Sequence, residues 1–253
     1  RRLQQALSWI FTPPFLVAFG LILVVFDPLQ RLARLFGPRP HELVVAGLQW
    51  SLLAALRICG TRFQVERSPA LKRFMPYIVI ANHQSMFDVP IVGALLLTNF
   101  PKFVAKRELA RLIPSISYNL RRGGNALIDR GDRGQALEAI ADLGRRSERR
   151  GVSVVIYPEG TRARGGELKV FKPAGTLGLL EAAPRLSVVP LAIDGSWKLL
   201  RYGMRPIPFG TRVRVWIGDP LARADGEDRE ALLGRAEAEI RRTIEGWREM
   251  PPA

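Results

Sequence analysis

The sequence predicts an α/β protein, a mixed, largely parallel sheet flanked by helices, preceded by an N-terminal pair of apolar helices. Two observations support this fold class. Short apolar, β-branched runs alternate with longer helical patterns over most of the chain, which is typical of a sheet with helices on its faces. The first part of the chain instead contains two long apolar stretches. We therefore divide the chain into residues 1–59 and residues 60–253.

Composition and charge narrow the class of partner. The chain has 253 residues, of which 47% are hydrophobic, enough for a sizeable core. It carries 38 Lys and Arg against 23 Asp and Glu, a net charge of +15. This excess predicts an acidic partner: nucleic acid, an anionic membrane, a phosphorylated substrate or an acidic carrier protein. The single cysteine, Cys59, excludes an internal disulfide and a multi-cysteine metal site.

Two apolar runs stand out in the N-terminal segment, FLVAFGLILVVF at residues 15–26 and LVVAGLQWSLLAAL at residues 43–56. A membrane-spanning helix needs about 20 apolar residues. The first run is too short unless it extends towards the N-terminus. Pro13 and Pro14 are expected to break or kink such an extension.

The linker between these runs, residues 27–42, is rich in proline and carries Arg31, Arg34 and Arg39. If both runs crossed the membrane, these arginines would lie on the opposite side from the following domain. That conflicts with the preference of Lys and Arg for the cytoplasmic side. We therefore expect a two-helix membrane anchor that enters one leaflet, with its arginines at the headgroups. A pair of buried core helices is the alternative, and a cleaved signal peptide is disfavoured because no small-residue cleavage site follows the first run.

The remaining chain has the pattern of a globular domain. Strands are expected at residues 77–81, 102–105, 125–129, 152–157, 187–193 and 212–217. Helices are expected near residue 88 and over residues 134–150, 174–183 and 227–248. The strand at 212–217 alternates basic and apolar residues, so one of its faces should be wet. The last helix has an apolar stripe formed by Leu233, Ala236, Ile240, Ile244 and Trp247.

The motif NHQSMFD, residues 82–88, follows the first of these strands. Loops at the carboxyl ends of strands are where such sheets build their sites. His83 could act there as a general base, and Asp88 could fix its tautomer and stabilise the protonated ring. Alternatively, Asp88 caps the next helix, with Pro90 in its first turn, and His83 is an ordinary turn histidine. The spacing of the two residues does not decide between these interpretations.

A second strand also ends in a polar turn, in the motif VVIYPEGTRAR at residues 154–164. The turn contains Glu159, Gly160, Thr161 and Arg162. Glycine allows a ligand to approach the backbone closely, and arginine offers a planar fork that suits phosphate. The alternative interpretation is an ordinary β-turn with solvated charges.

Cations cluster between the two motifs. Lys106 and Arg130 each lie at the end of an expected strand, and Arg121 and Arg122 precede a Gly-Gly turn. Clustered cations at strand ends suit an anionic headgroup. We assign Lys106 and Arg130 to the candidate site. For Arg121 and Arg122 a solvated basic face is an equally good interpretation.

Over roughly residues 75–220 the sequence resembles the glycerolipid acyltransferase family, which includes the bacterial 1-acylglycerol-3-phosphate O-acyltransferases. The resemblance lies in four blocks in the family's order: NHQSMFD (82–88), GNALIDR (124–130), YPEGTRAR (157–164) and VVPLAI (188–193). Leu127 replaces an aromatic residue that is usual in the second block, and Tyr157 stands where Phe is common in the third. The fourth block is centred on Pro190.

The resemblance implies roles for the first block. His83 would deprotonate the free glycerol hydroxyl of 1-acylglycerol-3-phosphate, and Asp88 would orient and charge-stabilise His83. The hydroxyl would then attack the thioester of acyl-CoA or of acyl-acyl carrier protein, giving phosphatidic acid. The resemblance assigns no covalent role to Ser85.

The resemblance also implies a substrate-binding set. Arg130 and Arg162, helped by Lys106, would hold the phosphate, and Glu159 and Gly160 would shape the acceptor pocket. The full set is Lys106, Arg130, Glu159, Gly160, Thr161 and Arg162. No metal and no cofactor are expected, apart from the acyl donor as a substrate. The N-terminal helices are similar to the two-helix motif of bacterial members, so we expect the cytoplasmic face of the inner membrane and anionic lipids as partners.

Three alternatives to this function stay open. An acyltransferase of the same family could act on another lysolipid, such as a lyso-ornithine lipid or a lysophospholipid in remodelling. A non-enzymatic membrane lipid-binding protein would keep the anchor and basic pocket without needing His83 and Asp88 together. A nucleic-acid-binding protein would explain the charge, but the cations are dispersed and lack interleaved aromatics, so nucleic acid is not expected as a partner.

Overall fold

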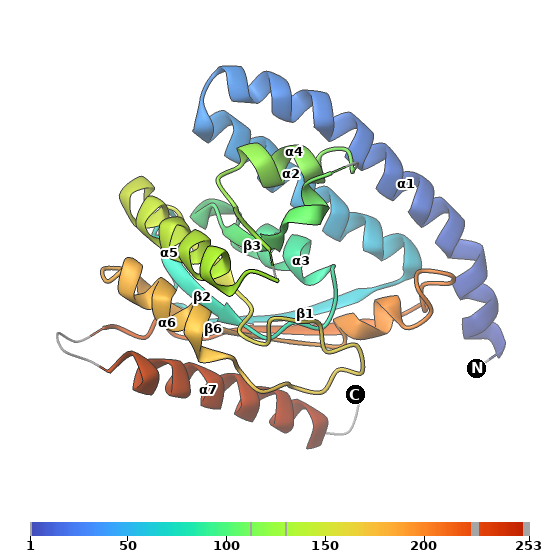
Figure 1. Ribbon diagram of the computed structural model, residues 1–253. Coiled ribbons are helices and arrows are strands. Elements are labelled where there is room, and N and C mark those ends of the chain that lie inside the picture. Colours follow the sequence, from blue (N-terminus) through green and yellow to red (C-terminus); the bar gives the residue numbers. More distant parts are fainter. Residues whose placement is uncertain (1, 112, 130, 224–227, 250–253) are drawn as a thin grey trace.

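The structure is a computed structural model that describes residues 2–111, 113–129, 131–223 and 228–249. A seven-stranded sheet lies at its centre (Figure 1), with the strand order β1-β7-β6-β2-β5-β3-β4. The strands are β1 (Arg62–Arg67), β2 (Tyr77–Ala81), β3 (Lys102–Lys106), β4 (Ala126–Ile128), β5 (Val154–Ile156), β6 (Ser187–Asp194) and β7 (Arg212–Ile217).

Strand direction confirms the mixed, largely parallel sheet. The five strands β6, β2, β5, β3 and β4 run parallel to one another. The remaining two run the other way, because β7 pairs antiparallel with β6 and β1 pairs parallel with β7. The loops that follow β2, β3, β4, β5 and β6 therefore leave from the same edge of the sheet, where the two polar motifs lie.

Helices cover both faces of the sheet. The α-helices are α1 (Arg2–Leu35), α2 (Pro38–Ala55), α3 (Asp88–Leu95), α4 (Ile116–Arg122), α5 (Arg133–Arg150), α6 (Pro173–Ala182) and α7 (Arg229–Glu249). Short 3-10 segments span Leu56–Cys59, Leu97–Asn99, Arg107–Ala110 and Ser196–Leu200. The helices expected near residue 88 and over 134–150, 174–183 and 227–248 are thus confirmed, with shifts of a few residues at their ends.

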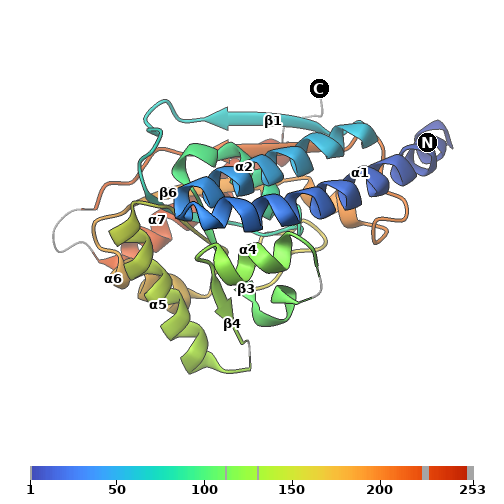
Figure 2. The same cartoon turned by 90° about the horizontal axis from the view of Figure 1, so that it is seen from above.

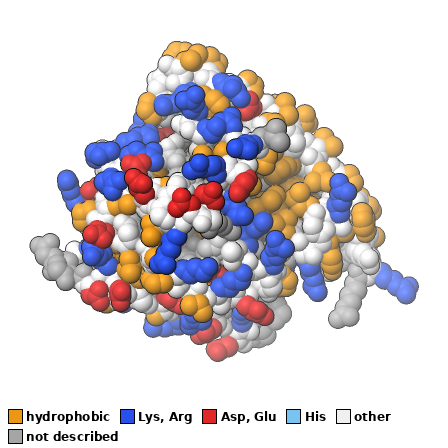
Figure 3. All heavy atoms as spheres, viewed as in Figure 1, with side chains coloured by type: hydrophobic (Ala, Val, Ile, Leu, Met, Phe, Trp, Pro, Cys, Tyr) orange, Lys and Arg blue, Asp and Glu red, His pale blue; other side chains and the backbone are white. Residues whose placement is uncertain are grey.

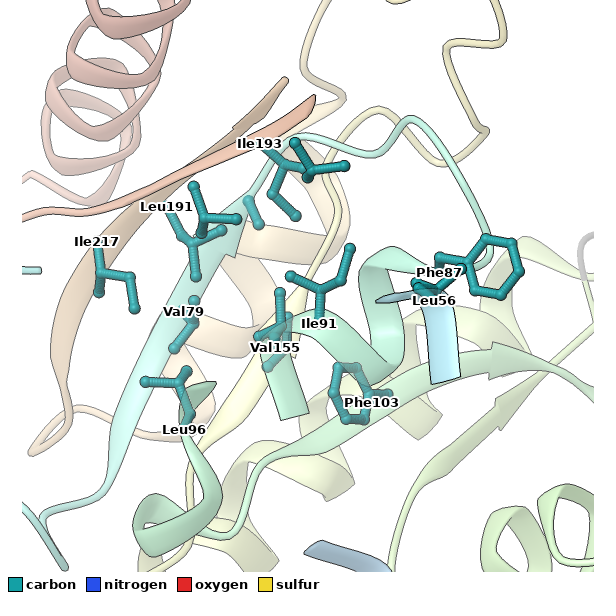
Figure 4. Packing of buried hydrophobic residues seen from close by; sticks show 14 of the residues in the cluster. Leu56, Val79, Phe87, Ile91, Leu96, Phe103, Val155, Leu191, Ile193 and Ile217 are labelled. Carbon is teal, nitrogen blue, oxygen red and sulfur yellow. The ribbon is translucent and has the colours of Figure 1, made fainter. Parts of the chain in front are cut away.

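Alternation along β2 separates two cores. Val79 and Ala81 belong to a cluster with side chains of α1, α2 and α3. Figure 4 shows part of this cluster, including Val79 of β2 and Ile91 of α3. Ile78 and Ile80 point to the other face, where α5, α6 and α7 cover them. All five residues of β2 are buried, because a central strand of a parallel sheet is covered on both faces. The expected stripe of α7 is buried in the second core.

Two elements were absent from the expected list. β1 has the sequence RFQVER and forms one edge of the sheet. Its residues are mostly exposed, and its two apolar residues, Phe63 and Val65, alternate with polar ones without forming a continuous apolar run. α4 has only seven residues and lies in the basic segment 106–130. The strand RVRVWI does alternate as expected, with Val213, Val215 and Ile217 buried.

The N-terminal hairpin differs from the expectation in two ways. α1 is one helix of 34 residues that contains Pro13, Pro14 and Pro28. Of the break or kink expected at Pro13 and Pro14, the break is therefore wrong. The linker expected over residues 27–42 is also mostly helical, and the turn between α1 and α2 is reduced to Phe36 and Gly37. A proline removes one helical hydrogen bond, and here the packing of α1 against the rest of the protein offsets that cost.

Contacts with the domain hold α1 at both ends. Near the N-terminus, the Ser8 and Thr12 hydroxyls accept hydrogen bonds from the backbone N–H groups of Phe209 and Ile207, at 2.9 Å each. Near the other end, the Ser115 hydroxyl donates to the Leu23 carbonyl at 2.6 Å. Figure 2 shows α1 and α2 side by side, with α4 next to them. Side chains from both sides of residue 59 therefore share one core.

The outer face of the hairpin is apolar. Along α1 the exposed large side chains are Leu3, Trp9, Ile10, Val17, Leu21, Val24, Val25, Leu29, Leu32 and Leu35. Figure 3 shows hydrophobic side chains along the rim of the molecule that α1 forms. α1 and the segment Pro38–Cys59 are both long and apolar enough to cross a membrane. Isolated apolar side chains are common on protein surfaces, but a continuous stripe of this length marks an interaction face.

Candidate active site

The first motif leaves the sheet at the end of β2, where the neighbouring strand fixes its position. The Asn82 side chain donates to the Ile193 carbonyl at 2.8 Å and accepts from the Ile193 N–H at 2.7 Å. This pair of hydrogen bonds extends the β2–β6 pairing one residue past the strand. His83 therefore begins its turn from a rigid point.

His83 and Asp88 form a direct pair. His83 Nδ1 lies 2.8 Å from Asp88 Oδ2, and the Asp88 side chain is 0% exposed while that of His83 is 16% exposed. A carboxylate can only accept, so Nδ1 carries the hydrogen in this bond. The tautomer leaves a lone pair on Nε2, the ring atom that a general base uses. Asp88 is the first residue of α3, whose N-cap is Phe87, so the alternative of Asp88 as a helix cap is wrong.

Asp88 also organises the turn between the two residues. Its Oδ2 accepts the backbone N–H groups of Gln84 at 2.7 Å and Ser85 at 2.8 Å. Its Oδ1 accepts the Ser196 hydroxyl at 2.6 Å. Hydrogen-bond donors of this kind offset the free energy that a buried carboxylate loses when it is removed from water. The same carboxylate therefore holds the imidazole and the turn that presents it.

Ser196 is a residue that the sequence analysis missed. It lies 108 residues from Asp88 along the chain and follows Gly195, whose φ is +90°. A Cβ on Gly195 would lie 2.3 Å from the Arg212 carbonyl oxygen, so the turn that aims Ser196 requires glycine. The fourth block ends at residue 193, two residues before this turn, and it contains no signal for the contact.

Glu159 of the second motif is buried and joins the loops that carry the two motifs. Its Oε1 accepts the His83 N–H at 2.6 Å, and its Oε2 accepts the Lys169 N–H at 3.2 Å. The Ala163 N–H donates to the His83 carbonyl at 2.7 Å. The structure thus brings the first and third blocks together around His83. Burial raises the pKa of Glu159, and the two backbone N–H groups oppose that rise.

Tyr157 stacks on His83, with ring centroids 4.3 Å apart and an interplanar angle of 20°. Burial raises the pKa of this phenol well above its usual value, and the nearby Asp88 charge adds to the rise. The stack restricts the imidazole to one plane. A phenylalanine, the residue common at this position of the third block, would stack in the same way.

The other residues of the second motif lie in the same loop. Lys169 Nζ donates to the Thr161 hydroxyl at 3.0 Å and to the Arg162 carbonyl at 2.9 Å. Gly160 has a φ of +67°, in the left-handed region that favours glycine. Lys169 is therefore a second residue that sequence reasoning missed, and it shapes the loop that carries Thr161 and Arg162.

The basic residues expected at the site differ in where the structure places them. Lys106 is the last residue of β3, half-buried, at the same edge of the sheet as His83. Arg130 lies outside the described residues. Arg121 donates to the Ala110 carbonyl, and both Arg121 and Arg122 are exposed at the end of α4. Within the described ranges, no group of three or more His, Cys, Asp and Glu residues could hold a metal ion.

A buried His–Asp pair at the carboxyl edge of a parallel sheet is the arrangement expected of an enzyme that uses a general base. Residues 62–194 match the Acyltransferase family model, which is 133 of the 253 residues, and the chain belongs to this family. The resemblance seen in the four blocks is thereby confirmed.

Individual relatives extend the match. The chain is 29% identical over 196 residues to a human protein named 1-acyl-sn-glycerol-3-phosphate acyltransferase beta, covering 77% of this chain and 69% of the relative. It is 27% identical over 187 residues to the Escherichia coli 1-acyl-sn-glycerol-3-phosphate acyltransferase, with 74% and 73% covered. The crystal structure of the 1-acyl-sn-glycerophosphate acyltransferase PlsC from Thermotoga maritima superposes with a TM-score of 0.80, at 21% identity and over 99% of this chain and 100% of that one. This last likeness confirms the fold, including the N-terminal helices.

Proposed function

We propose that this enzyme transfers a fatty acyl group from a thioester donor to the free hydroxyl of 1-acylglycerol-3-phosphate, giving phosphatidic acid. The observation that carries the proposal is the buried pair of His83 and Asp88 in the first family block, joined to the third block by Glu159. The names of the relatives support the substrate.

The geometry of this pair supports the following reaction. His83 Nε2 takes the proton of the acceptor hydroxyl while Asp88 stabilises the ring that becomes charged. The hydroxyl oxygen attacks the thioester carbon, the carbon–sulfur bond breaks, and the leaving thiolate takes the proton back from His83. Each atom is accounted for without a serine or cysteine intermediate, and we propose that no metal or cofactor takes part. The donor is acyl-CoA or acyl-acyl carrier protein.

We further propose that Arg162, Lys106 and Arg130 bind the acceptor phosphate, with Gly160 and Thr161 in the wall of the pocket. Arg162 follows the buried Glu159 in the loop that contacts His83, and Lys106 lies at the same sheet edge. Guanidinium groups bind phosphate in a bidentate manner, and ammonium groups bind it as point charges.

The apolar outer face of α1 supports membrane attachment. We propose that the hairpin of α1 and α2 lies in one leaflet of the inner membrane, with the active site on the cytoplasmic side. Ser8, Thr12 and Ser115 bond the inner side of the hairpin to the domain, which leaves the apolar face outward. The net charge of +15 suits an anionic leaflet.

A panel of lysolipids, offered with acyl-CoA and with acyl-acyl carrier protein, tests the proposal by mass spectrometry of the products. We expect phosphatidic acid from 1-acylglycerol-3-phosphate, and a loss of about 10²- to 10⁴-fold in rate for His83→Ala. His41→Gln, which removes the chain's other histidine, is the matched control and should keep its rate. Near-normal transfer by His83→Ala, or no turnover by the wild type, would refute the proposal.

A further inference from the structure

The loop between β1 and β2 exposes a short run of cations and apolar side chains. Lys72, Arg73, Phe74 and Met75 are all exposed, with Phe74 at 70% and Met75 at 45%. This 72–75 loop precedes β2, whereas the catalytic turn follows β2. The two therefore lie at opposite ends of that strand, and the loop has no part in the proposed chemistry.

The fold holds this loop in one conformation. The Asn99 amide, itself buried, donates to the carbonyls of Lys72 at 2.9 Å and Met75 at 2.8 Å. The Tyr77 hydroxyl accepts the Lys72 N–H at 3.0 Å. Phe74 has a φ of +58°, which is uncommon for an aromatic residue. The hydrogen-bonded backbone thus holds Phe74 and Met75 exposed to solvent, although contact between apolar side chains and water is unfavourable.

The loop is continuous with the apolar hairpin. The Phe74 ring lies 6.4 Å from the Phe100 ring, and the Arg39 guanidinium lies 4.4 Å above Phe100. Arg39 is in the first turn of α2, next to Leu35 and Phe36, which are 80% and 74% exposed. Figure 2 shows the turn between α1 and α2 on the same side of the molecule as the end of β1 that leads into the loop.

We propose that the 72–75 loop is a second membrane contact, which docks on an anionic bilayer beside the turn of the hairpin. Phe74 and Met75 enter the boundary between headgroups and acyl chains, and Lys72 and Arg73 lie at the lipid phosphates. Cations that flank an exposed apolar tip match an anionic leaflet in both charge and polarity. The inference rests on the proposed membrane attachment of the hairpin. It adds that the domain itself contacts the lipid, beside the turn between α1 and α2.

A site-specific probe tests the loop in the full-length protein. Phe74→Cys is labelled with an environment-sensitive nitrobenzoxadiazole group, which Cys59 escapes because it is fully buried. After reconstitution into phosphatidylglycerol-containing vesicles, we expect blue-shifted emission and quenching by brominated lipid. Val65→Cys, an exposed apolar position on the edge strand β1, is the matched control and should keep the emission of a probe in water.

A third label separates this proposal from the membrane attachment of the hairpin. Val24→Cys places the probe on the exposed face of α1. A lipid signal at position 24 with none at position 74 overturns the loop proposal alone, and no signal at either position overturns both. A blue shift at position 74 that brominated lipid does not quench would indicate contact with a second copy of the chain, and would also overturn it.

The charges give an independent readout. Lys72→Glu combined with Arg73→Glu should reduce quenching of the position-74 probe at least about twofold in anionic vesicles. In phosphatidylcholine vesicles, the same pair of substitutions should change the quenching little. Equal quenching with and without these substitutions in anionic vesicles would contradict a docking surface for anionic lipid.

Discussion

At the scale of single residues, the Asp88 carboxylate links the two sides of the candidate site. It receives three donors from its own turn and a fourth, the Ser196 hydroxyl, from the loop after β6. A hydroxyl that donates to a buried carboxylate contributes about 1.5–3 kcal/mol, because the charge has no water to replace it. In the proposed mechanism Ser196 acts through Asp88, as a positioning residue.

Ser196→Ala should lower kcat about tenfold or more and change KM little, because the imidazole loses orientation while the substrate contacts stay. Ser196→Thr keeps the hydroxyl and should recover a large part of the rate. Steady-state kinetics of both variants, with thermal unfolding as a check on folding, measures this split. Equal losses in the Ala and Thr variants would show that packing, and not the hydroxyl, is what matters at this position.

The burial of Glu159 predicts how the stability of the protein depends on pH. Burial raises the pKa of this carboxyl above its ordinary value of 4.5, so the folded state holds the proton more tightly than the unfolded state does. Its ionisation therefore costs stability as pH rises from the unfolded pKa through the folded one. Compared with Glu159→Gln, which does not titrate, the wild type should lose unfolding free energy as the pH rises above the ordinary pKa of 4.5. Parallel stability curves of the two proteins in denaturant would contradict this sign.

At the scale of elements, an ion cluster around the buried Glu42 and Lys102 joins α2 to the sheet. Glu42 of α2 accepts Lys102 Nζ at 2.8 Å and Arg150 Nη2 at 2.6 Å on one oxygen, and Arg39 Nη1 at 3.0 Å on the other. Lys102 begins β3 and is buried, and Arg150 ends α5. Burial lowers the pKa of Lys102, and Glu42 opposes this shift. The cluster therefore ties three elements to one carboxylate.

Glu42→Ala should destabilise the protein by about 3–5 kcal/mol, because it leaves the Lys102 ammonium buried without its partner. Replacing both residues, as Glu42→Leu with Lys102→Met, should recover much of that loss. Asp142→Ala removes an exposed pair with Arg146 on α5 and should cost at most about 1 kcal/mol. Denaturant unfolding of the three variants measures the differences. A double variant no more stable than Glu42→Ala would mean that the ion pair itself is essential.

The elements also show what the sequence could predict. β2 and β6 were predictable because continuous apolar runs are specific to strands covered on both faces. β1 was missed because RFQVER has only two apolar residues and no continuous apolar run, as is common for an exposed edge strand. The pair of His83 and Asp88 lies within one seven-residue motif, so local spacing was enough to suggest it. Ser196 meets the site through a contact 108 residues away along the chain, and Lys169 through contacts across its own irregular loop, and no periodic pattern encodes either.

The break expected at the prolines of α1 does not occur, because packing stabilises the helix there. Propensity assigns Pro13 and Pro14 a cost that an isolated helix could not offset. In the folded protein, Phe15 is buried beside them, and Thr12 accepts a backbone hydrogen bond from Ile207. Tertiary contacts of this kind routinely override local propensity.

At the scale of the whole molecule, the hairpin and the catalytic domain are one packed unit. Phe15 of α1 is fully buried, and its ring lies 5.7 Å from that of Phe19 and 6.2 Å from that of Phe87. Phe87 immediately precedes Asp88 at the start of α3. The same helix thus presents an apolar face outward and supports the catalytic turn from within.

This arrangement predicts that a substitution on the buried face of α1 also lowers activity. Phe15→Ala should cost about 3–5 kcal/mol, the range for emptying a buried aromatic position, and should lower acyl transfer, because Phe87 loses its packing partner beside Asp88. Val17→Ala, on the exposed face of the same helix, should change stability by no more than about 0.5 kcal/mol. Denaturant unfolding in detergent, followed by tryptophan emission and by activity, should give one coincident transition. If residues 1–59 instead unfolded separately from the domain, two transitions would appear. Phe15→Ala would then shift only the unfolding of residues 1–59, and activity would be lost only in the other transition.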